Sequence, residues 1–527
     1  MRRGTIYPPF RDFGLDNSAK PQNKPKMRMN CSRAETFYYS ICVGHSTVFN
    51  VKSNCGTGPQ QSMKQIQEQQ ELCKKLASLV ADQGGRAYYV GGFVRDRVMA
   101  ETVGADPEET RIPDIDIEVH GIRPEKLYGI LETMGEPLSF GSSFGIYSLK
   151  GYNIDVALPR KERAVGRGHR DFEVDVDPFI GTENAARRRD FTMNAMMEDV
   201  LTGEITDHFG GREDIARGVI RHVDPKSFPE DPLRVLRAAQ FAARLGFTVA
   251  EETLELMRGI DLSGLSMERV EGEMVKALLE SRSPSVFFEV LRNCGKLSPW
   301  FREIEDMIGI PQDPLYHPEG DVWNHTMEVL DRGASVRDQA EEPYGFMMLC
   351  LTHDLGKLVT TERAEDGRIH SYGHEDEGVP VADRLLSRVV SRKDVKKYVL
   401  TMIPIHMKPN MTAYARSKVK VTNKMFDQAA SPPDLVLFAW ADRPVFVGDQ
   451  RFSGNQKFLF ERLAMYREYM SRPCVMGHDL MANGLEPGED FSEILAYAHK
   501  LRLAGIPKEE ALKQTLRYAS KLRGRRL

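Results

Sequence analysis

The stretch Asp114-Ile115-Asp116-Ile117-Glu118-Val119 decides the fold of the N-terminal half of this chain. Acidic and apolar residues alternate along it, which predicts a strand that buries one face and exposes the other. Asp114 and Asp116 then share a face and lie about 7 Å apart along the backbone. Two carboxylates on one face of a strand can hold divalent cations.

A glycine turn precedes this strand. Residues 87–90 predict a strand, Gly91-Gly92-Phe93-Val94-Arg95-Asp96 follows, and a helix is expected from near Val94. Paired glycines let the backbone turn tightly, and a helix N-terminus suits a phosphate. Each motif alone is common in ordinary turns and exposed strands. The two in this order predict a Mg²⁺-dependent site for a nucleoside triphosphate, and therefore nucleotidyl transfer.

The composition is that of a soluble globular protein. The 527 residues are 41% hydrophobic and 28% charged, which is enough for about three or four domains. No apolar run approaches the roughly 20 residues of a membrane span. Seven cysteines without a CxxC pair fit a reducing compartment. We therefore expect a cytoplasmic protein that does not enter a membrane.

Basic charge gathers at both ends of the chain, although the formal net charge is -4. Residues 1–60 are basic and lack a periodic apolar pattern, which predicts a disordered extension. Residues 500–526 are also strongly basic. This segment could follow a phosphate backbone, or it could be the solvated face of a helix.

A third carboxylate is expected in the same sheet. After a helix predicted over residues 124–134, residues 146–150 and 153–157 form a hairpin around the Lys150-Gly151 turn. Asp155 lies on the polar face of its second strand, which makes it a candidate third catalytic carboxylate.

Two basic segments follow the hairpin. Residues 160–170 predict a basic loop that contains glycine and that either orders around a polyanion or moves freely at the surface. Arg187-Arg188-Arg189-Asp190 precedes an apolar helix start at Phe191. Clustered arginines need solvent or phosphate, so contact with a nucleotide's phosphates or ribose is the favoured interpretation.

The segment from Glu230 to Arg244 predicts a helix with Asp231 as N-cap and Pro232 as its first residue. Arg234 and Arg237 share one face of it. Asp231 could simply pair with Arg234, or the two could present an acceptor and donors to a base edge. The pattern stays helical from 254 to 291, with a hinge expected at 268–273.

These motifs in order resemble those of the bacterial class II tRNA nucleotidyltransferases, the CCA-adding enzymes, over residues 85–295. The motifs are Gly91-Gly92-x-x-Arg95-Asp96, Asp114-x-Asp116, Arg188-Arg189-Asp190, Asp207-x-x-Gly210-Gly211-x-x-Asp214, Glu230-Asp231-x-x-Arg234 and Glu268-Arg269 to Glu273. Bacterial poly(A) polymerases are similar over the same span.

The resemblance implies a role for each motif. Asp114 and Asp116 would carry Mg²⁺, and Arg188, Arg189 and Asp190 would meet the ribose and phosphates of the nucleotide. Asp231 with Arg234 would select CTP or ATP without a nucleic-acid template. The nucleotide-binding set would be Gly91, Gly92, Arg95, Arg188, Arg189, Asp190, Asp231, Arg234 and Arg237.

A second constellation lies between residues 317 and 442. It contains His317-Pro-Glu-Gly-Asp-Val-Trp-Asn-His325, the pair His353-Asp354 after an apolar segment, and the isolated residues His370, His374, His406 and Asp442. Imidazoles with a bridging carboxylate suit a metal. The segment resembles an HD-family phosphohydrolase domain.

By that resemblance the metal ligands would be His325, His353, Asp354, His374, His406 and Asp442, with Lys357 as a phosphate contact. His370 lies four residues before His374, and either could face the site if the segment is helical. A bound metal would activate water to attack a phosphate ester. The metal could be Mg, Mn, Ni or Co.

The combination resembles the multifunctional form of the CCA-adding enzyme. We expect an α+β protein with a small mixed-sheet head and helical domains after it, which uses CTP and ATP on the tRNA 3′ end. The expected domains are the extension 1–60, a nucleotidyltransferase head 61–220, a neck 221–315 for nucleotide selection and RNA binding, an HD domain 316–446 and an RNA-binding tail 447–527. The alternatives are a poly(A) polymerase, an enzyme that adds only part of CCA, or mainly a phosphohydrolase with an RNA-binding head.

Overall fold

The computed structural model describes residues 59–103, 115–139, 146–149, 151–164, 172–443 and 453–524. Residues 57–527 form one compact unit. The expected extension 1–60 falls almost wholly outside the described residues, and so does Asp114. No described helix is both long enough and apolar enough to cross a membrane.

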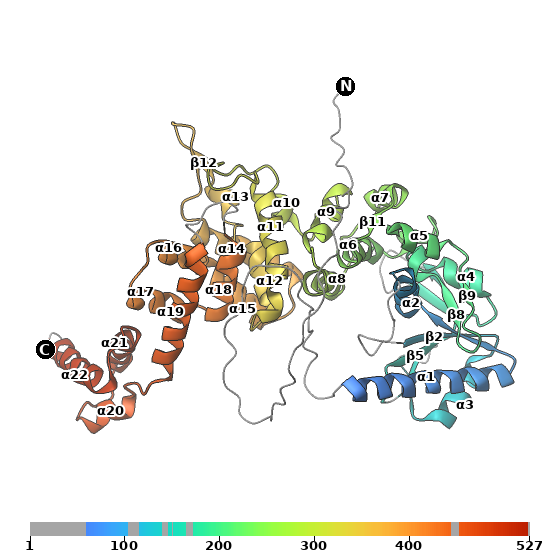
Figure 1. The fold of residues 1–527 in the computed structure, drawn as a ribbon, viewed down its shortest axis with the longest axis horizontal. Coiled ribbons are helices and arrows are strands. Elements are labelled where there is room, and N and C mark those ends of the chain that lie inside the picture. Colours follow the sequence, from blue (N-terminus) through green and yellow to red (C-terminus); the bar gives the residue numbers. More distant parts are fainter. Residues whose placement is uncertain are drawn as a thin grey trace, which may run out of the picture. The chain divides into compact units, whose positions relative to one another are not determined.

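The head contains a seven-stranded mixed sheet, in the order β3-β4-β5-β2-β1-β8-β9 (Figure 1). Only β2 and β5 run parallel; every other neighbouring pair is antiparallel. The strands are β1 Arg86–Val90, β2 Ile115–His120, β3 Pro137–Ser139, β4 Ile146–Leu149, β5 Ile154–Ala157, β8 Met197–Asp199 and β9 Ile205–Thr206. The predicted mixed sheet and its 146–157 hairpin are confirmed.

Helices pack against the apolar side chains that the central strands of this sheet present. In β2, Ile115, Ile117 and Val119 are almost completely buried. Helix α1 packs against β1 and α3, while α2 packs against β1, β2 and α5. The head helices are α1 Pro59–Asp82, α2 Gly92–Val103, α3 Pro124–Met134, α4 Thr182–Arg187 and α5 Gly211–Arg217.

Two local predictions for the head are corrected. Residues 160–164 of the predicted loop 160–170 instead form β6 (Arg160–Ala164), which pairs antiparallel with β7 (Phe172–Val176); residues 165–170 lie outside the described residues. The predicted helix start at Phe191 is wrong: only a short 3-10 turn, Thr192–Asn194, follows it. Its apolar residues are buried on all sides, so they fill a core segment and do not form one face of a helix. They are Phe191, Met193, Met196 and Met197.

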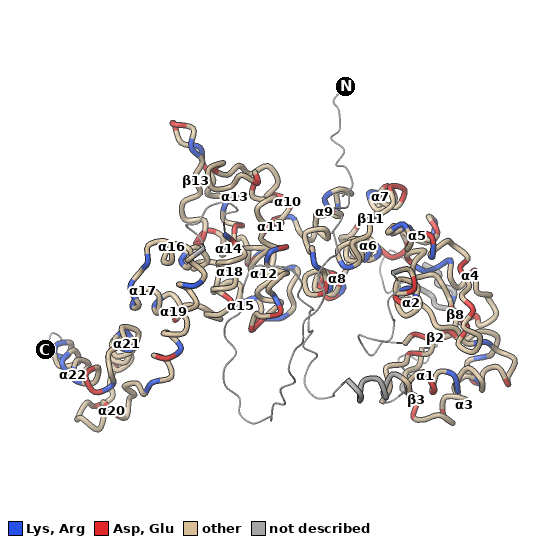
Figure 2. Tube along the Cα trace, viewed as in Figure 1, with Lys and Arg blue, Asp and Glu red and all other residues tan. Residues whose placement is uncertain are grey.

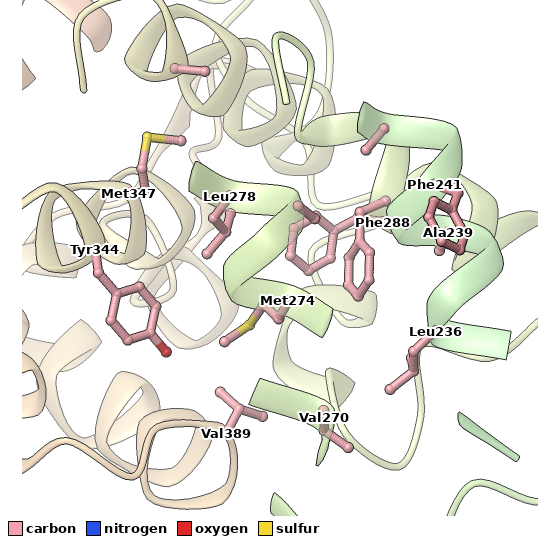
Figure 3. Close-up of a cluster of buried hydrophobic side chains, with 14 of the residues drawn as sticks. Leu236, Ala239, Phe241, Val270, Met274, Leu278, Phe288, Tyr344, Met347 and Val389 are labelled. Carbon is pink, nitrogen blue, oxygen red and sulfur yellow. The ribbon is translucent and has the colours of Figure 1, made fainter. Parts of the chain in front are cut away.

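The next segment is helical, and its helices pack on one another. They are α6 Leu233–Leu245, α7 Glu251–Arg258, α8 Met267–Glu280 and α9 Ser285–Asn293, with short strands β10 Val219–Ile220 and β11 Thr248–Val249. In Figure 3, side chains of α8 lie between those of α6 and α9 on one side and Tyr344, Met347 and Val389 of later helices on the other. The hinge expected at 268–273 is wrong, since these residues lie inside the continuous helix α8. Glu271 there is buried and accepts a hydrogen bond from Tyr344.

Ten further helices build the segment that carries the predicted metal ligands and the helix that follows it. They are α10 Arg302–Glu305, α11 Val322–Ala334, α12 Pro343–Thr352, α13 Lys357–Thr360, α14 His374–Val389, α15 Lys393–Met402, α16 Lys408–Tyr414, α17 Val419–Asp427, α18 Pro432–Ala441 and α19 Ser453–Ser471. A small hairpin, β12 Glu362–Arg363 with β13 Ile369–His370, joins α13 to α14. Helix α12 is buried on every side, which explains its continuous apolar sequence.

The last helices have a separate apolar core. They are α20 Gly477–Ala482, α21 Phe491–Leu503 and α22 Lys508–Gly524. Their buried cluster includes Leu480, Ile494 and Ala519. Figure 2 shows basic and acidic residues along α22. The amide of Asn423 on α17 donates to the carbonyl of Leu503, which ties this part to the helices before it.

Candidate functional site

The glycine turn and the acidic strand come together in the head. Gly91 has φ +70, which favours glycine. A Cβ placed on Gly91 would lie 3.5 Å from Asp116 Oδ2 and 3.6 Å from Arg189 Nη1. Helix α2 begins at Gly92, two residues earlier than expected. The turn therefore lies directly beside one candidate carboxylate and one candidate arginine.

Asp116 and Asp155 are neighbours across the sheet. They occupy matched positions of the parallel pair β2 and β5, and both side chains are exposed. Adjacent strands are about 4.8 Å apart, so one divalent cation can reach oxygens of both. Ser148 on β4 donates a hydrogen bond to Asp155. Because the candidate ligand atoms of Asp116 and Asp155 are all oxygens, they suit Mg²⁺.

Glu118, which the sequence did not single out, anchors the arginines beside this carboxylate pair. Its side chain is buried and accepts from His120 at 2.9 Å and from Arg189 at 3.3 Å, while Arg188 approaches to 4.0 Å. Burial raises the pKa of Glu118, but the His120 hydrogen bond and the Arg189 charge outweigh it and hold the pKa at about 2. The carboxylate is therefore ionised and fixes Arg189.

Asp190 is buried and bound within the protein. One oxygen accepts from the Phe191 N–H at 2.7 Å and from Asn194 at 3.0 Å, and the other accepts from Arg237 at 2.7 Å. Asn194 in turn accepts from Arg95 at 3.0 Å. Among the described residues, Asp190 therefore organises two of the predicted nucleotide-binding arginines.

The predicted pair of Asp231 with Arg234 does not form. Asp231 pairs with Arg269 of α8, both carboxylate oxygens lying 2.9 Å from one guanidinium nitrogen. Arg234 donates instead to the carbonyls of Ser227 at 2.7 Å and Arg188 at 2.6 Å. Asp231 still accepts from the Leu233 N–H, but α6 begins at Leu233, one residue later than predicted.

The second predicted constellation converges as a buried cluster. Its histidines come from four places in the chain: α11, the end of α12, the start of α14 and the turn before α16. The ligand atoms form two groups, His325 with His353 and Asp442, and Asp354 with His374 and His406. All six predicted metal ligands are in this cluster.

Asp354 lies between the two groups. Its Oδ2 is 3.3 Å from His353 Nε2 and 3.6 Å from His325 Nε2, while its Oδ1 is 3.4 Å from His374 Nε2 and 3.9 Å from His406 Nε2. Lys357 forms an ion pair with Asp354 at 2.7 Å and donates a hydrogen bond to Gln312 at 2.7 Å. This is the geometry of a carboxylate that could bridge two metal ions.

The cluster fits a metal by its chemistry. His353 Nε2 is buried and has no hydrogen-bond partner among the described residues, which is costly unless a ligand meets it. Burial raises the pKa of Asp442, but the hydrogen bond from His325 and the charge of His353 hold it at about 2. Burial also raises the pKa of Asp354, but the charges of Lys357 and His353 outweigh burial and hold that pKa well below its usual range. The carboxylates of Asp354 and Asp442 are therefore both ionised.

His370 lies outside this cluster. Its ring stacks on Tyr372 with centroids 4.5 Å apart, and His374 contributes to the site. The structure therefore decides between the two histidines that the sequence left open. Glu319, to which the sequence analysis gave no role, accepts a hydrogen bond from His325 Nδ1 at 2.7 Å. Its spacing from His325 carries no recognisable signal, because it lies in a loop.

The glycine turn, the carboxylate strands and the separate imidazole cluster define a nucleotidyltransferase head joined to a histidine-rich candidate metal site. A model of the poly A polymerase head domain matches residues 87–221. The multifunctional CCA protein of Nitrosococcus oceani is 40% identical over 306 residues, which cover 57% of this chain and 70% of that protein. The chain belongs to the family of multifunctional CCA proteins.

Other comparisons agree with this assignment. The multifunctional CCA protein of Actinobacillus pleuropneumoniae is 36% identical over 347 residues, which cover 64% of this chain and 80% of that protein. Among solved structures, the Thermotoga maritima CCA-adding enzyme complexed with tRNA is similar in fold, with a TM-score of 0.55 and 19% identity. That match covers 88% of this chain and 98% of the solved one.

Proposed function

We propose that this protein adds and repairs the 3′-terminal CCA of tRNA, using CTP and ATP, and that its second centre is a metal-dependent phosphohydrolase. The observation that carries the first activity is the matched pair Asp116 and Asp155 beside the Gly91 turn and Arg189. The names of the relatives and of the similar structures support the same substrates.

In the head, Asp116 and Asp155, with Asp114 beyond the described residues, would hold Mg²⁺. When bound, Mg²⁺ polarises the α-phosphate and neutralises the charge of the departing pyrophosphate. The tRNA 3′-hydroxyl attacks the α-phosphorus, its proton leaves toward the carboxylate face, and the bond to pyrophosphate breaks. Arg189, which Glu118 fixes, stabilises the negative charge that develops on the phosphates.

Nucleotide selection is proposed for the pair Asp231 and Arg269 together with Arg234. The Asp231 and Arg269 side chains are about one third exposed, so they remain accessible to a base edge. Arg234 is held by two backbone carbonyls, which fixes the direction of its guanidinium. Fixed donors and an acceptor can discriminate a base edge without a template strand.

In the second centre, His325, His353 and Asp442 would hold one ion, His374 and His406 a second, and Asp354 would bridge them. A bound metal would lower the pKa of a water molecule and so activate it for attack on a phosphate ester. Lys357, which forms an ion pair with Asp354, is the proposed contact to a substrate phosphate. No side-chain nucleophile is needed.

The test is extension of a tRNA that lacks its CCA, with Mg²⁺ and product length resolved to one nucleotide. CTP alone should add two residues, and ATP should add one more only after them. A long A tail would instead make the protein a poly(A) polymerase, and addition that stops within CCA would make it a partial enzyme.

Two variants separate the centres. Asp116→Ala should abolish nucleotide addition and spare hydrolysis of p-nitrophenyl phosphate. The double variant His353→Ala with Asp354→Ala should do the reverse. Loss of both activities in either folded variant would contradict two independent sites, while absence of extension by the wild type would leave a phosphohydrolase with an RNA-binding head.

A further inference from the structure

The loop before α11 contains a carboxylate, Glu319, that contacts His325 of the histidine cluster on the ring nitrogen facing away from the other ligands. Glu319 is nearly buried, with its side chain 9% exposed. Its Oε1 accepts from His325 Nδ1 at 2.7 Å and from His317 Nδ1 at 3.0 Å. The opposite nitrogen of the same ring, His325 Nε2, faces Asp442 at 3.1 Å. One imidazole thus joins Glu319 to the cluster.

The other three histidines are oriented differently. Each directs Nδ1 to the backbone carbonyl three residues earlier: His353 to Cys350 at 3.1 Å, His374 to Ser371 at 2.8 Å and His406 to Ile403 at 2.7 Å. Local backbone geometry therefore fixes these rings whatever the neighbouring side chains are. Only His325 depends on a side chain for its orientation.

We propose that Glu319 is a positioning residue of the phosphohydrolase centre, which holds His325 in the tautomer and orientation that a metal needs. This inference rests on the proposed hydrolase function. A carboxylate on the far nitrogen forces the proton onto Nδ1 and leaves the Nε2 lone pair free for the ion. Because the acceptor is charged, it also raises the basicity of the ring more than a carbonyl does.

The loop keeps Glu319 in place. Asn324 of α11 donates to the Glu319 carbonyl at 3.1 Å. Asp321 caps the same helix by accepting from the Asn324 N–H at 2.9 Å, and its other oxygen accepts from the Gly309 N–H at 2.7 Å. The Asp321 carbonyl accepts from Gln312, whose own oxygen binds Lys357. The carboxylate is thus delivered by a backbone fixed at several points.

His317 is the outer partner of Glu319. Its side chain is 23% exposed, and its ring meets His325 edge-on with centroids 4.7 Å apart. If Glu319 acts directly on His325, removal of His317 leaves the 2.7 Å contact intact. His317 therefore serves as an internal comparison for the effect of Glu319.

The experiment titrates metal-free full-length protein with Mn²⁺ in a calorimeter, for the wild type and for Glu319→Gln, Glu319→Asp and His317→Ala. Glu319→Gln keeps the shape but removes the charge, and it should weaken Mn²⁺ binding about 10- to 100-fold. Glu319→Asp should weaken it less, because the charge remains. Rescue of Mn²⁺ affinity by Glu319→Asp relative to Glu319→Gln would separate the effect of the charge from a purely structural role.

The matched control is Glu375→Gln. Glu375 lies 3.5 Å from His374 Nδ1, but that nitrogen already meets the Ser371 carbonyl, so Mn²⁺ affinity should not change. Nucleotide addition to tRNA by the same preparations reports that each variant is folded.

Three results would overturn the proposal. In the first, folded Glu319→Gln binds Mn²⁺ as tightly as the wild type, which leaves the hydrolase intact but removes the role of Glu319. In the second, His317→Ala weakens binding as much as Glu319→Gln does. In the third, the wild type binds no metal and hydrolyses no phosphate ester, and the proposed hydrolase function fails with it.

Discussion

At the scale of single residues, the buried carboxylate of Asp190 holds two of the arginines that we propose bind the nucleotide. Asp190 receives hydrogen bonds from the backbone, from Asn194 and from Arg237, and Asn194 passes the connection to Arg95. Both arginines also lie over the ring of Phe241, at 5.1 and 5.2 Å. The arginines can point in fixed directions because this charge holds them.

Asp190→Asn tests that role. The substitution keeps the shape but leaves Arg237 without its charged partner, so the free energy of unfolding should fall by about 2 kcal/mol. The apparent KM should rise for CTP and ATP alike, since both would lose the same arginine geometry. Urea unfolding and initial rates measure the two effects. A rise for only one nucleotide would contradict a shared positioning role.

The same pair gives a pH dependence. Burial raises the pKa of Asp190, but the charge of Arg237 and the hydrogen bond from Asn194 outweigh it, so the pKa lies below its usual 3.8. A depressed pKa in the folded state contributes stability above pH 3.8 and loses it as pH falls through the lowered value. The stability difference between wild type and Asp190→Asn should thus be constant near neutral pH and shrink below about pH 3.8. A difference that grows there would be inconsistent with an ionised Asp190.

At the scale of elements, the geometry of the histidine cluster depends on how closely α13 and α14 approach each other. A Cβ on Gly356 would lie 1.9 Å from the His374 carbonyl oxygen and 2.7 Å from the Gly378 nitrogen. Only glycine lets the start of α13 meet the first turn of α14. That contact sets the positions of Lys357 and His374, the first residues of the two helices.

Gly356→Ala should therefore disturb the phosphohydrolase centre alone. The added methyl meets backbone atoms, which cannot rotate away, so the helices must separate and hydrolysis of p-nitrophenyl phosphate should fall at least about tenfold. Gly264→Ala is the matched control, because nothing lies within 4 Å of its Cβ. Nucleotide addition should persist in both, and normal hydrolysis by Gly356→Ala would show that α13 and α14 can shift without loss.

Helix α22 presents a stripe of basic residues. Lys513, Arg517 and Lys521 are spaced by four residues, are all exposed, and make no ion pair with any described residue. The other two basic residues of α22 pair within the protein, Lys508 with Asp479 and Arg523 with Asp490. The spacing of the remaining three matches a helix face that follows a phosphate backbone.

Charge reversal tests this stripe. The triple variant Lys513→Glu, Arg517→Glu and Lys521→Glu should weaken tRNA binding and make its salt dependence shallower, by up to about one unit of log–log slope for each lost phosphate contact. Fluorescence anisotropy at several salt concentrations measures both. The control variant changes the net charge by the same amount through Arg384→Glu, Lys393→Glu and Lys397→Glu. An equal loss of tRNA affinity in that variant would mean that net charge, and not the α22 stripe, determines binding.

At the scale of the whole molecule, the sequence predicted both centres but not how they are supported. Strand alternation around Asp116 and the hairpin to Asp155 follow from local periodicity, and the HD residues follow from their order in the chain. Glu118, Glu319 and Arg269 could not be found in this way. Each acts across a long sequence separation or from a loop, where no spacing rule applies, and the pair of Asp231 with Arg269 replaced the local pair that helical spacing favoured.

The two centres also differ in donor chemistry, and metal exchange tests the difference. The head offers carboxylate oxygens, whereas the second cluster offers four imidazole nitrogens with its carboxylates. Oxygen donors suit Mg²⁺, and imidazole favours transition ions. After chelation and dialysis, Mg²⁺ alone should restore CCA addition, while hydrolysis of p-nitrophenyl phosphate should need Mn²⁺, Co²⁺ or Ni²⁺. Asp116→Ala supplies the control, because its hydrolysis should respond to metals as the wild type does. Full recovery of hydrolysis with Mg²⁺ alone would mean that the carboxylates Asp354 and Asp442, and not the imidazoles, determine which ion the second centre accepts.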